Sequence, residues 1–409
     1  MFSSRTPDNL APNRWTAALE NLRRSRRPFI DLTESNPTAA GFEYPRNLLA
    51  ALGDSRALVY APDPFGLVDA RCAVAADYGR RGIEVAIDRL VLTASTSEAY
   101  SLLFKLLADP GDEVLVPRPS YPLFEHLTRL DAVAMRHYDL EYHGRWSIDV
   151  ASVERAMTSR TRAVLVVSPN NPTGSFVRQQ ELDRLAELCA AVRDQNGAPH
   201  PAAIVADEVF ADYAIDGEAA AGAARPVERR DVLTFSLGGL SKSIALPQVK
   251  LGWIAIGGPE MLVDAAVDRL QLVCDAYLSV STPVQAAAAD LLSRGAAVRG
   301  RIQSRVAVNL AQLASAVAAV PSCSTLHTEG GWYGVLRVPS LQPEEDLVVD
   351  LLENRGVAVH PGYFFDFSTG AHLIVSLIVP ETQFADGIDR VLRHFDCRAG
   401  SMSASDRHA

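Results

Sequence analysis

Short apolar runs alternate with longer segments of helical period over the first 257 residues of the chain. The expected strands are residues 90–94, 113–117, 133–138, 162–168, 202–206, 232–237 and 250–256. Runs such as Ala163–Val167 are apolar at every position, as in strands that are buried on both faces of a parallel sheet. Helical patterns fill the gaps, notably at 97–108, 122–131 and 178–194. This alternation predicts a doubly wound α/β domain with a mainly parallel, seven-stranded sheet flanked by helices.

The pattern changes after residue 257. A helical region rich in Ala, Leu and Val covers about 259–320, and a strand near 332–338, a helix near 344–355 and a strand near 372–379 follow it. This order predicts a second, smaller α+β domain. The expected parts are an N-terminal arm with part of the small domain (1–45), a large domain (46–280), a small C-terminal domain (281–397) and a flexible tail (398–409).

The composition is that of an acidic chain with enough apolar residues for a sizeable core. Of its 409 residues, 48% are hydrophobic and 22% charged, and the net charge is −10, which argues against nucleic acid or a membrane surface as the main partner. No apolar run approaches the roughly 20 residues needed to cross a bilayer, and the first residues lack the apolar core of a signal peptide. The five cysteines form no C-x-x-C pair, so we expect a cytoplasmic protein without structural zinc or a disulfide scaffold.

Two loops that follow expected strands carry unusual polar residues, and ligands of open α/β sheets bind at such strand ends. The loop Ser168–Gly174 contains two prolines and a glycine, which would hold Asn171 in one direction, although an ordinary rigid turn is an equal alternative. The next strand ends in Asp207. A buried carboxylate needs a cation or a donor, so this residue either faces a positively charged ligand atom or caps a following helix.

Two further loops offer an amine and an anion site. Lys242 follows Gly-Gly-Leu-Ser and is one of only three lysines, with Lys105 and Lys250. A rare lysine in an apolar, glycine-rich setting is a candidate for a lowered pKa and Schiff-base chemistry. The segment Ala94–Glu98 (Ala-Ser-Thr-Ser-Glu) enters a helix, whose free N–H groups bind anions, with simple N-capping as the alternative.

The segments Ser168–Gly174, Asp207–Phe210 and Leu240–Lys242, in this order and spacing, resemble the class I/II aminotransferases of pyridoxal phosphate (PLP) fold type I. The resemblance covers about residues 31–394. It implies that Lys242 forms the Schiff base and moves the substrate proton. It also implies that Asp207 keeps the pyridine nitrogen protonated and that Asn171 donates to the phenolic oxygen of the cofactor.

The same resemblance implies the remaining cofactor contacts. Tyr121 is expected to stack on the ring. The expected phosphate ligands are Ser95, Thr96, Ser97, Ser241 and Lys250, with Tyr60 reaching across from a partner subunit. A homodimer with shared active sites follows from that last contact. The implied reaction moves an amino group between an L-amino acid and a 2-oxo acid through a Lys242 Schiff base and a quinonoid.

Three positions depart from the family pattern. Phe210 stands where a tyrosine usually donates to the phenolic oxygen, and losing that donor is expected to raise the pKa of the Schiff base. Lys250 stands where an arginine usually clamps the phosphate, which also makes Lys250 the competitor of Lys242 for the Schiff base. Ile374 stands where an arginine usually binds the substrate carboxylate. Candidates to replace that arginine are Arg118, Arg337, Asn36 and Tyr363.

These departures keep other functions open. A lyase, a cyclase or an oxidase acting on amino acids would use the same scaffold and cofactor. A non-catalytic regulator that binds PLP ranks lower, because the sequence shows no helix-turn-helix segment before the α/β region and no basic patch.

Overall fold

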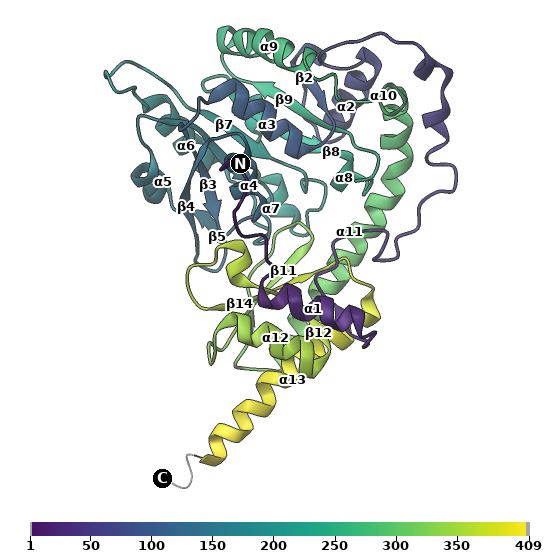
Figure 1. Ribbon diagram of the computed structural model, residues 1–409, viewed down its shortest axis with the longest axis vertical. Coiled ribbons are helices and arrows are strands. Elements are labelled where there is room, and N and C mark those ends of the chain that lie inside the picture. The colour runs from purple at the N-terminus through teal and green to yellow at the C-terminus, as the bar shows by residue number, and fades with distance from the viewer. Residues whose placement is uncertain (1, 406–409) are drawn as a thin grey trace.

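An eight-stranded mixed sheet forms the centre of the larger part of the molecule in the computed structural model, which describes residues 2–405 and their side chains up to residue 396 (Figure 1). Its strands are β2 (Leu90–Thr93), β3 (Glu113–Arg118), β4 (Ala134–Tyr142), β5 (Trp146–Ile148), β6 (Thr161–Val167), β7 (Ala203–Asp207), β8 (Thr234–Gly239) and β9 (Gly252–Gly257). Their order is β2-β9-β8-β7-β6-β3-β4-β5. Only β9 and β5 run against the others, so the sheet is mainly parallel as predicted.

The expected number of seven strands was wrong by one. All seven predicted runs form strands, and the eighth, β5, pairs with the end of β4 as an antiparallel hairpin. Strand β5 has only three residues and follows a turn at Gly144, whose φ is +85°. Three residues are too few for an alternating pattern to be visible in a sequence, which is why this strand was missed.

Helices cover both faces of the sheet. Alternate residues of the parallel strands pack on one side against α3 (Thr96–Leu107) and α9 (Glu260–Asp275). The intervening residues pack on the other side against α5 (Val150–Ala156) and α6 (Gln179–Ala191). The remaining helices of this part are α2 (Val68–Arg80), α4 (Leu123–Leu130), α7 (Gly217–Ala221), α8 (Leu240–Ser243) and α10 (Thr282–Ala286). This double burial explains the continuous apolar runs of the central strands.

The smaller part of the molecule contains an antiparallel sheet of order β10-β11-β14-β13. Its strands are β10 (Ser324–Thr325), β11 (Tyr333–Val338), β13 (His360–Pro361) and β14 (Ala371–Ser376), and a separate parallel pair joins β1 (Ile30–Asp31) to β12 (Val357–Ala358). The helices packed on it are α1 (Arg14–Arg24), α11 (Ala288–Ala318), α12 (Glu344–Arg355) and α13 (Glu381–Ser405). The smaller α+β unit predicted from the sequence is therefore present.

Helix α11 connects the two parts of the molecule (Figure 1). Its Leu291 and Leu292 pack into the core that β2 and β9 share with α2, whereas Val306 and Leu313 pack into the core of the small sheet. The helical region expected at 259–320 is therefore three helices, with Pro283 in the first turn of α10. A proline there fits the start of a helix, because it removes an N–H that would be unpaired in any case.

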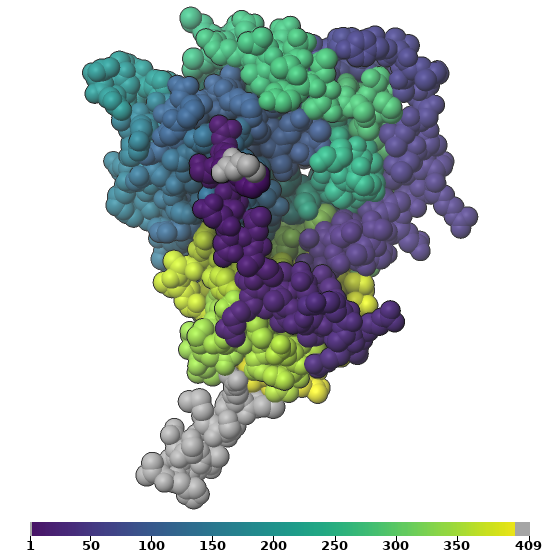
Figure 2. Space-filling model, in the orientation of Figure 1, coloured from purple at the N-terminus to yellow at the C-terminus, as the bar shows by residue number. Residues whose placement is uncertain are grey.

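The N-terminal residues that the structure describes lie on the surface. The N-terminal segment crosses the face shown in Figure 2, where the Arg129 guanidinium donates to the carbonyl of Ser4 at 3.0 Å. Helix α13 continues to Ser405, into the segment expected to be a flexible tail, and residues 406–409 of that segment lie outside the described residues. Within residues 2–405, no helix has the length and apolar character that a bilayer crossing requires.

Candidate active site

The carboxyl ends of three neighbouring parallel strands bring together the residues singled out in the sequence. Strands β6, β7 and β8 lie side by side, so the loop with Asn171, the end residue Asp207 and the turn into Lys242 meet at one edge. The Ser168 amide donates to the Asp207 carbonyl at 2.9 Å, and the Glu208 amide donates to that of Leu237 at 3.0 Å. The sheet therefore fixes the relative positions of all three loops.

Lys242 lies in an aromatic environment. Its Nζ is 4.8 Å from the ring centroid of Trp332 and 5.5 Å from that of Phe210. Burial lowers the pKa of Lys242 to about 8, and the charge of Asp207 opposes part of that shift. The Tyr213 hydroxyl donates to the Lys242 carbonyl at 2.5 Å and fixes the backbone of helix α8. An amine with a lowered pKa is available as a nucleophile near neutral pH.

Asp207 is buried and held by two donors. The Tyr100 hydroxyl donates to Oδ2 at 3.0 Å and the Val209 amide to Oδ1 at 3.1 Å. Burial raises the pKa of this carboxyl, while the Val209 and Tyr100 hydrogen bonds and the charge of Lys242 oppose the rise. The alternative that Asp207 caps a helix is wrong, because the next helix, α7, begins ten residues later at Gly217.

Two adjacent asparagines differ in their surroundings. Asn170 is fully engaged, since its Nδ2 donates to the Pro119 carbonyl and the Thr173 hydroxyl and its Oδ1 accepts from Ser120. Asn171 is also buried, but its Oδ1 has no hydrogen-bond partner among the described residues. Buried polar atoms are almost always hydrogen-bonded, so the unmatched Oδ1, an acceptor, indicates a missing donor beside the Asn171 amide.

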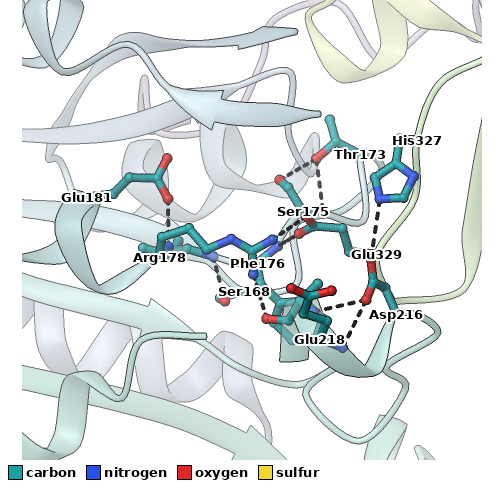
Figure 3. A network of polar contacts seen from close by, with 12 residues as sticks. Ser168, Thr173, Ser175, Phe176, Arg178, Glu181, Asp216, Glu218, His327 and Glu329 are labelled. Atoms are coloured by element: carbon teal, nitrogen blue, oxygen red, sulfur yellow. Dashed lines mark hydrogen bonds and ion pairs between the residues drawn. The ribbon is translucent and has the colours of Figure 1, made fainter. Parts of the chain in front are cut away.

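The loop that carries Asn171 is anchored to the small domain by Glu329 (Figure 3). This buried carboxylate accepts from the Phe176 amide at 2.8 Å and forms an ion pair with Arg178. Gly174 has φ +73°, and a Cβ there would come within 2.5 Å of the Gly330 carbonyl oxygen. Glycine is therefore required for the close approach of the two segments.

The expected phosphate loop lies beside the turn that leads to Lys242. The Ser95 hydroxyl accepts from the Glu98 amide at 3.1 Å, so this serine does cap helix α3, and Thr96 and Ser97 form the first turn. Gly252 pairs with Gly239, just before Ser241, and a Cβ on Gly252 would lie 3.0 Å from the Ser95 backbone. The two segments with hydroxyls therefore converge on one point, next to a helix N-terminus.

The other residues expected to contact the cofactor lie nearer the protein surface. Tyr121 is 42% exposed, and its ring packs edge-on against Phe124, which packs in the same way against Tyr100, the residue that binds Asp207. Lys250 is exposed, has φ +63°, and precedes β9 rather than starting it. Tyr60 is 82% exposed, and it lines a surface pocket with Tyr277. Among the described residues, no hydrogen bond, ion pair or ring contact joins Lys250 or Tyr60 to Lys242.

The four residues proposed to bind the substrate carboxylate are exposed or already paired. Arg118 pairs with Asp139 at 2.5 Å, and Arg337 is exposed and donates to a serine hydroxyl of β10. Asn36 is exposed and caps its own turn, and Tyr363 is 40% exposed. The side chain of Ile374 is fully enclosed in an apolar cluster, so no charged group reaches the site from that position.

Four aromatic residues at the site were missed in the sequence. They are Tyr100, Tyr213, Trp332 and Tyr333. Tyr100 lies one helical turn after Thr96, so its place on the same face of α3 could have been inferred. The others depend on contacts between distant segments, and only the Gly330-Gly331 pair before Trp332 gave a local signal of a close approach.

The residues present fit pyridoxal phosphate. An amine of lowered pKa, a buried carboxylate and a buried amide without a partner lie at adjacent strand ends, next to converging hydroxyls at a helix N-terminus. The amine matches an aldehyde, the carboxylate a pyridine nitrogen and the hydroxyls a phosphate. Asn171 offers its Nδ2 to a phenolic oxygen, because its Oδ1 can only accept a hydrogen bond. The site can thus hold this cofactor with residues of a single chain, apart from any contact supplied by Tyr60.

Known proteins with this sequence pattern and fold are aminotransferases. A family model described as aminotransferase class I and II matches residues 27–385. The chain is 27% identical to the alanine aminotransferase of Mycobacterium tuberculosis (strain ATCC 25618 / H37Rv), over 88% of this chain and 84% of that protein. It is 25% identical to the tyrosine aminotransferase of Bos taurus, over 96% of this chain and 89% of that protein.

Solved structures agree with this assignment of the fold. The alanine aminotransferase from Pyrococcus furiosus superposes with a TM-score of 0.84 at 23% identity, over 97% of this chain and 100% of that chain. A Thermus thermophilus aspartate aminotransferase mutant superposes with a TM-score of 0.79 at 25% identity, over 96% and 99%. The chain belongs to the aminotransferase class I and II family and is a pyridoxal phosphate-dependent aminotransferase of fold type I.

Proposed function

We propose that Lys242 is the residue that binds the cofactor covalently and carries the proton of the reaction. The observation that supports this most strongly is its environment, because Lys242 has a pKa lowered to about 8 and lies between aromatic rings near Asp207. Lys250 is exposed and lacks such an environment. Bound PLP supplies an electron sink for the carbon that loses a proton.

The surrounding residues have distinct tasks in this proposal. Asp207 holds a positive charge at the ring nitrogen, and Tyr100 orients that carboxylate. Asn171 donates to the phenolic oxygen through its Nδ2, and Thr96, Ser97 and Ser241 bind the phosphate with the helix N-terminus. Lys242 Nζ would then take the proton from the substrate carbon that bears the nitrogen and return it to the other carbon bonded to that nitrogen.

We further propose that the exchange includes an L-amino acid and a 2-oxo acid, and that the protein works in the cytoplasm. The relatives named alanine and tyrosine aminotransferase support the first part. The second part rests on cysteines that form no C-x-x-C pair and on an acidic composition.

Single-turnover absorbance spectra of the PLP-loaded protein test this function. Each of a pool of L-amino acids is mixed with the yellow protein without an acceptor, and the product is identified by mass. Conversion to the pyridoxamine form with release of a keto acid is the expected result. Ammonia release without that conversion would contradict transamination and would indicate a lyase. Lys242→Ala is expected to lose conversion by at least a thousandfold.

A homodimer is the second part of the proposal. Leu58, Val59 and Tyr60 are 89%, 62% and 82% exposed, and Tyr277 nearby is 58% exposed. A contiguous apolar surface of this kind is typical of a protein interface. Sedimentation at micromolar concentration is expected to give twice the mass of one chain, 44.2 kDa. A single-chain mass for the loaded protein would contradict a site completed by Tyr60 of a second copy.

A further inference from the structure

The helix that carries Lys242 is too short to hold itself in place. Helix α8 has four residues, Leu240–Ser243, and helices of this length are unstable without contacts to the rest of a protein. Its own hydrogen bonds are few. The Leu246 amide donates to the Leu240 carbonyl at 2.9 Å, and the Ala245 amide donates to the Lys242 carbonyl at 3.2 Å. The remaining carbonyls at the end of the helix need donors from elsewhere.

Two tyrosine hydroxyls from distant segments supply such donors. The Tyr213 hydroxyl donates to the Lys242 carbonyl at 2.5 Å and lies 3.5 Å from that of Ser243. The Tyr44 hydroxyl donates to the Ala245 carbonyl at 2.5 Å, although 201 positions separate these two residues in the sequence. The two tyrosines therefore hold the C-terminal end of α8 and the turn that follows it.

That turn has an unfavourable backbone conformation. Ala245 is fully buried and has φ +57°, which an L-residue other than glycine adopts only where its surroundings hold it. The preceding residue, Ile244, packs closely on helix α11, because a Cβ on Gly295 would lie 2.6 Å from the Ile244 Cβ. The Tyr44 hydrogen bond and the α11 contact are the interactions that hold this conformation.

Tyr213 touches the surroundings of Lys242 at two points. Its hydroxyl binds the lysine backbone, and its ring packs edge-on, at 5.1 Å, against Trp332, which lies 4.8 Å from Lys242 Nζ. The neighbouring Asp212 accepts from Arg299 of α11 at 3.1 Å and pairs with Arg80 of α2. Burial raises the pKa of Tyr213, so its hydroxyl stays protonated and remains a donor.

The position of the lysine backbone matters for the reaction. A group that moves a proton must lie within hydrogen-bond reach of the reacting carbon, and a small displacement slows the transfer strongly. The lysine side chain is a flexible four-carbon stem, so its own bonds do not fix Nζ. Its anchor on α8 and the rings around the amine must do so.

We propose that Tyr213 and Tyr44 are positioning residues for Lys242, whose hydroxyls fix the backbone of α8 so that Nζ stays aligned for proton transfer. They act through the lysine and do not take part in the chemistry. This inference rests on the proposed role of Lys242 and adds to it the residues that place the lysine.

Amide hydrogen exchange of the PLP-loaded protein, followed by mass spectrometry, tests whether the hydroxyls hold α8. Tyr213→Phe removes one hydroxyl and keeps the ring against Trp332. It is expected to speed exchange of the amides at 244–246 about tenfold, as expected for one hydrogen bond, and Tyr44→Phe about threefold. Exchange at the wild-type rate in both variants would overturn the inference.

Tyr138→Phe is the matched control. Tyr138 is buried, and its hydroxyl also donates to a backbone carbonyl, that of Leu165, at 2.8 Å. This variant loses a hydrogen bond of the same kind outside α8. It is expected to leave exchange at 244–246 and the conversion of substrate unchanged, so equal effects of Tyr138→Phe and Tyr213→Phe would overturn the inference.

Single-turnover conversion by L-alanine and by L-alanine deuterated at the α-carbon tests the link to proton transfer. Tyr213→Phe is expected to lower the maximum rate about tenfold and to change the half-saturating concentration less than twofold. Tyr44→Phe is expected to lower the maximum rate about threefold. The ratio of the rates with ordinary and deuterated L-alanine is expected to be at least as large as in the wild type, because the slowed step is the proton transfer.

The outcomes separate this inference from the proposed function. An unchanged maximum rate in Tyr213→Phe, or a change confined to the half-saturating concentration, would overturn the inference while the proposed function stood. A ratio that falls toward one would overturn it too, because a step other than proton transfer would then be slowed. A wild-type protein that converts no L-amino acid would contradict both.

Discussion

Phe210 gives the surroundings of Lys242 a particular character. Its ring lies 5.5 Å from Lys242 Nζ and packs edge-on against Trp332 at 5.3 Å, so this side of the amine is apolar and offers no hydroxyl. The donors at the site lie elsewhere, in the amide nitrogen of Asn171 and in the Tyr100 hydroxyl that binds Asp207. The hydrogen-bond donors at the site therefore differ from the family pattern, in which a tyrosine hydroxyl stands at the position of Phe210.

Adding a hydroxyl at Phe210 tests that balance. Phe210→Tyr is expected to lower the pKa of the Schiff base by about one unit, roughly the value of one hydrogen bond to a charged group, because the new donor stabilises the deprotonated form. The measurement is a spectral pH titration of both loaded proteins. Phe367→Tyr, in the small domain, is the matched control, and titration curves of wild type and Phe210→Tyr that coincide would refute the prediction.

Among the elements, the loop from β6 to α6 depends most on the small domain. Glu329 accepts from the Phe176 amide and pairs with Arg178, while its own carbonyl accepts from the amides of Ile215 and Asp216 at 2.8 and 3.0 Å (Figure 3). One residue of the small domain thus fixes two loops of the large one. The position of Asn171 follows from this contact as well as from the strand that precedes it.

Glu329→Gln separates the charge from the hydrogen bond. The amide oxygen can still accept from Phe176, but Arg178 loses its charge partner, so the variant is expected to be less stable by about 3 kcal/mol. Urea unfolding monitored by circular dichroism gives the free energy of unfolding. Glu228→Gln removes a surface pair with Arg225 and is expected to cost less than about 1 kcal/mol. Equal losses for the two variants would show that the Glu329 charge has no special role.

For the whole molecule, the sequence predicted what is local and repeated. The seven apolar runs became strands, and Asp207 and Lys242 were identifiable because strand ends of a parallel sheet meet. The roles of Tyr213 and Glu329 were not visible, because each depends on contacts with segments far along the chain. Hydrophobic periodicity predicts which elements form, but it does not predict which side chains of distant elements touch.

Two histidines of the small sheet make the stability of the whole molecule depend on pH. Burial lowers the pKa values of His360 and His372 to about 4, while the unfolded chain keeps the ordinary value of about 6.5. Between pH 6.5 and 4 the unfolded state therefore binds more protons, so the free energy of unfolding falls as the pH falls. Each histidine contributes up to about 3 kcal/mol to that loss.

Urea unfolding at pH 7, 5.5 and 4.5 measures this dependence. His372→Phe is expected to make the loss of stability with acid clearly smaller than in the wild type. His143→Gln, at an exposed histidine beside Glu141, is expected to leave it unchanged. An identical pH dependence in wild type and His372→Phe would mean that acid acts through other groups.

Borohydride reduction of the PLP-loaded protein, followed by proteolysis and mass mapping, tests most directly that Lys242 holds the cofactor. The chain has only three lysines, Lys105, Lys242 and Lys250, so the modified peptide identifies the residue without ambiguity. The account predicts one reduced adduct for each chain, on the peptide that contains Lys242. An adduct on Lys250 or Lys105, or no adduct in a yellow protein, would contradict it.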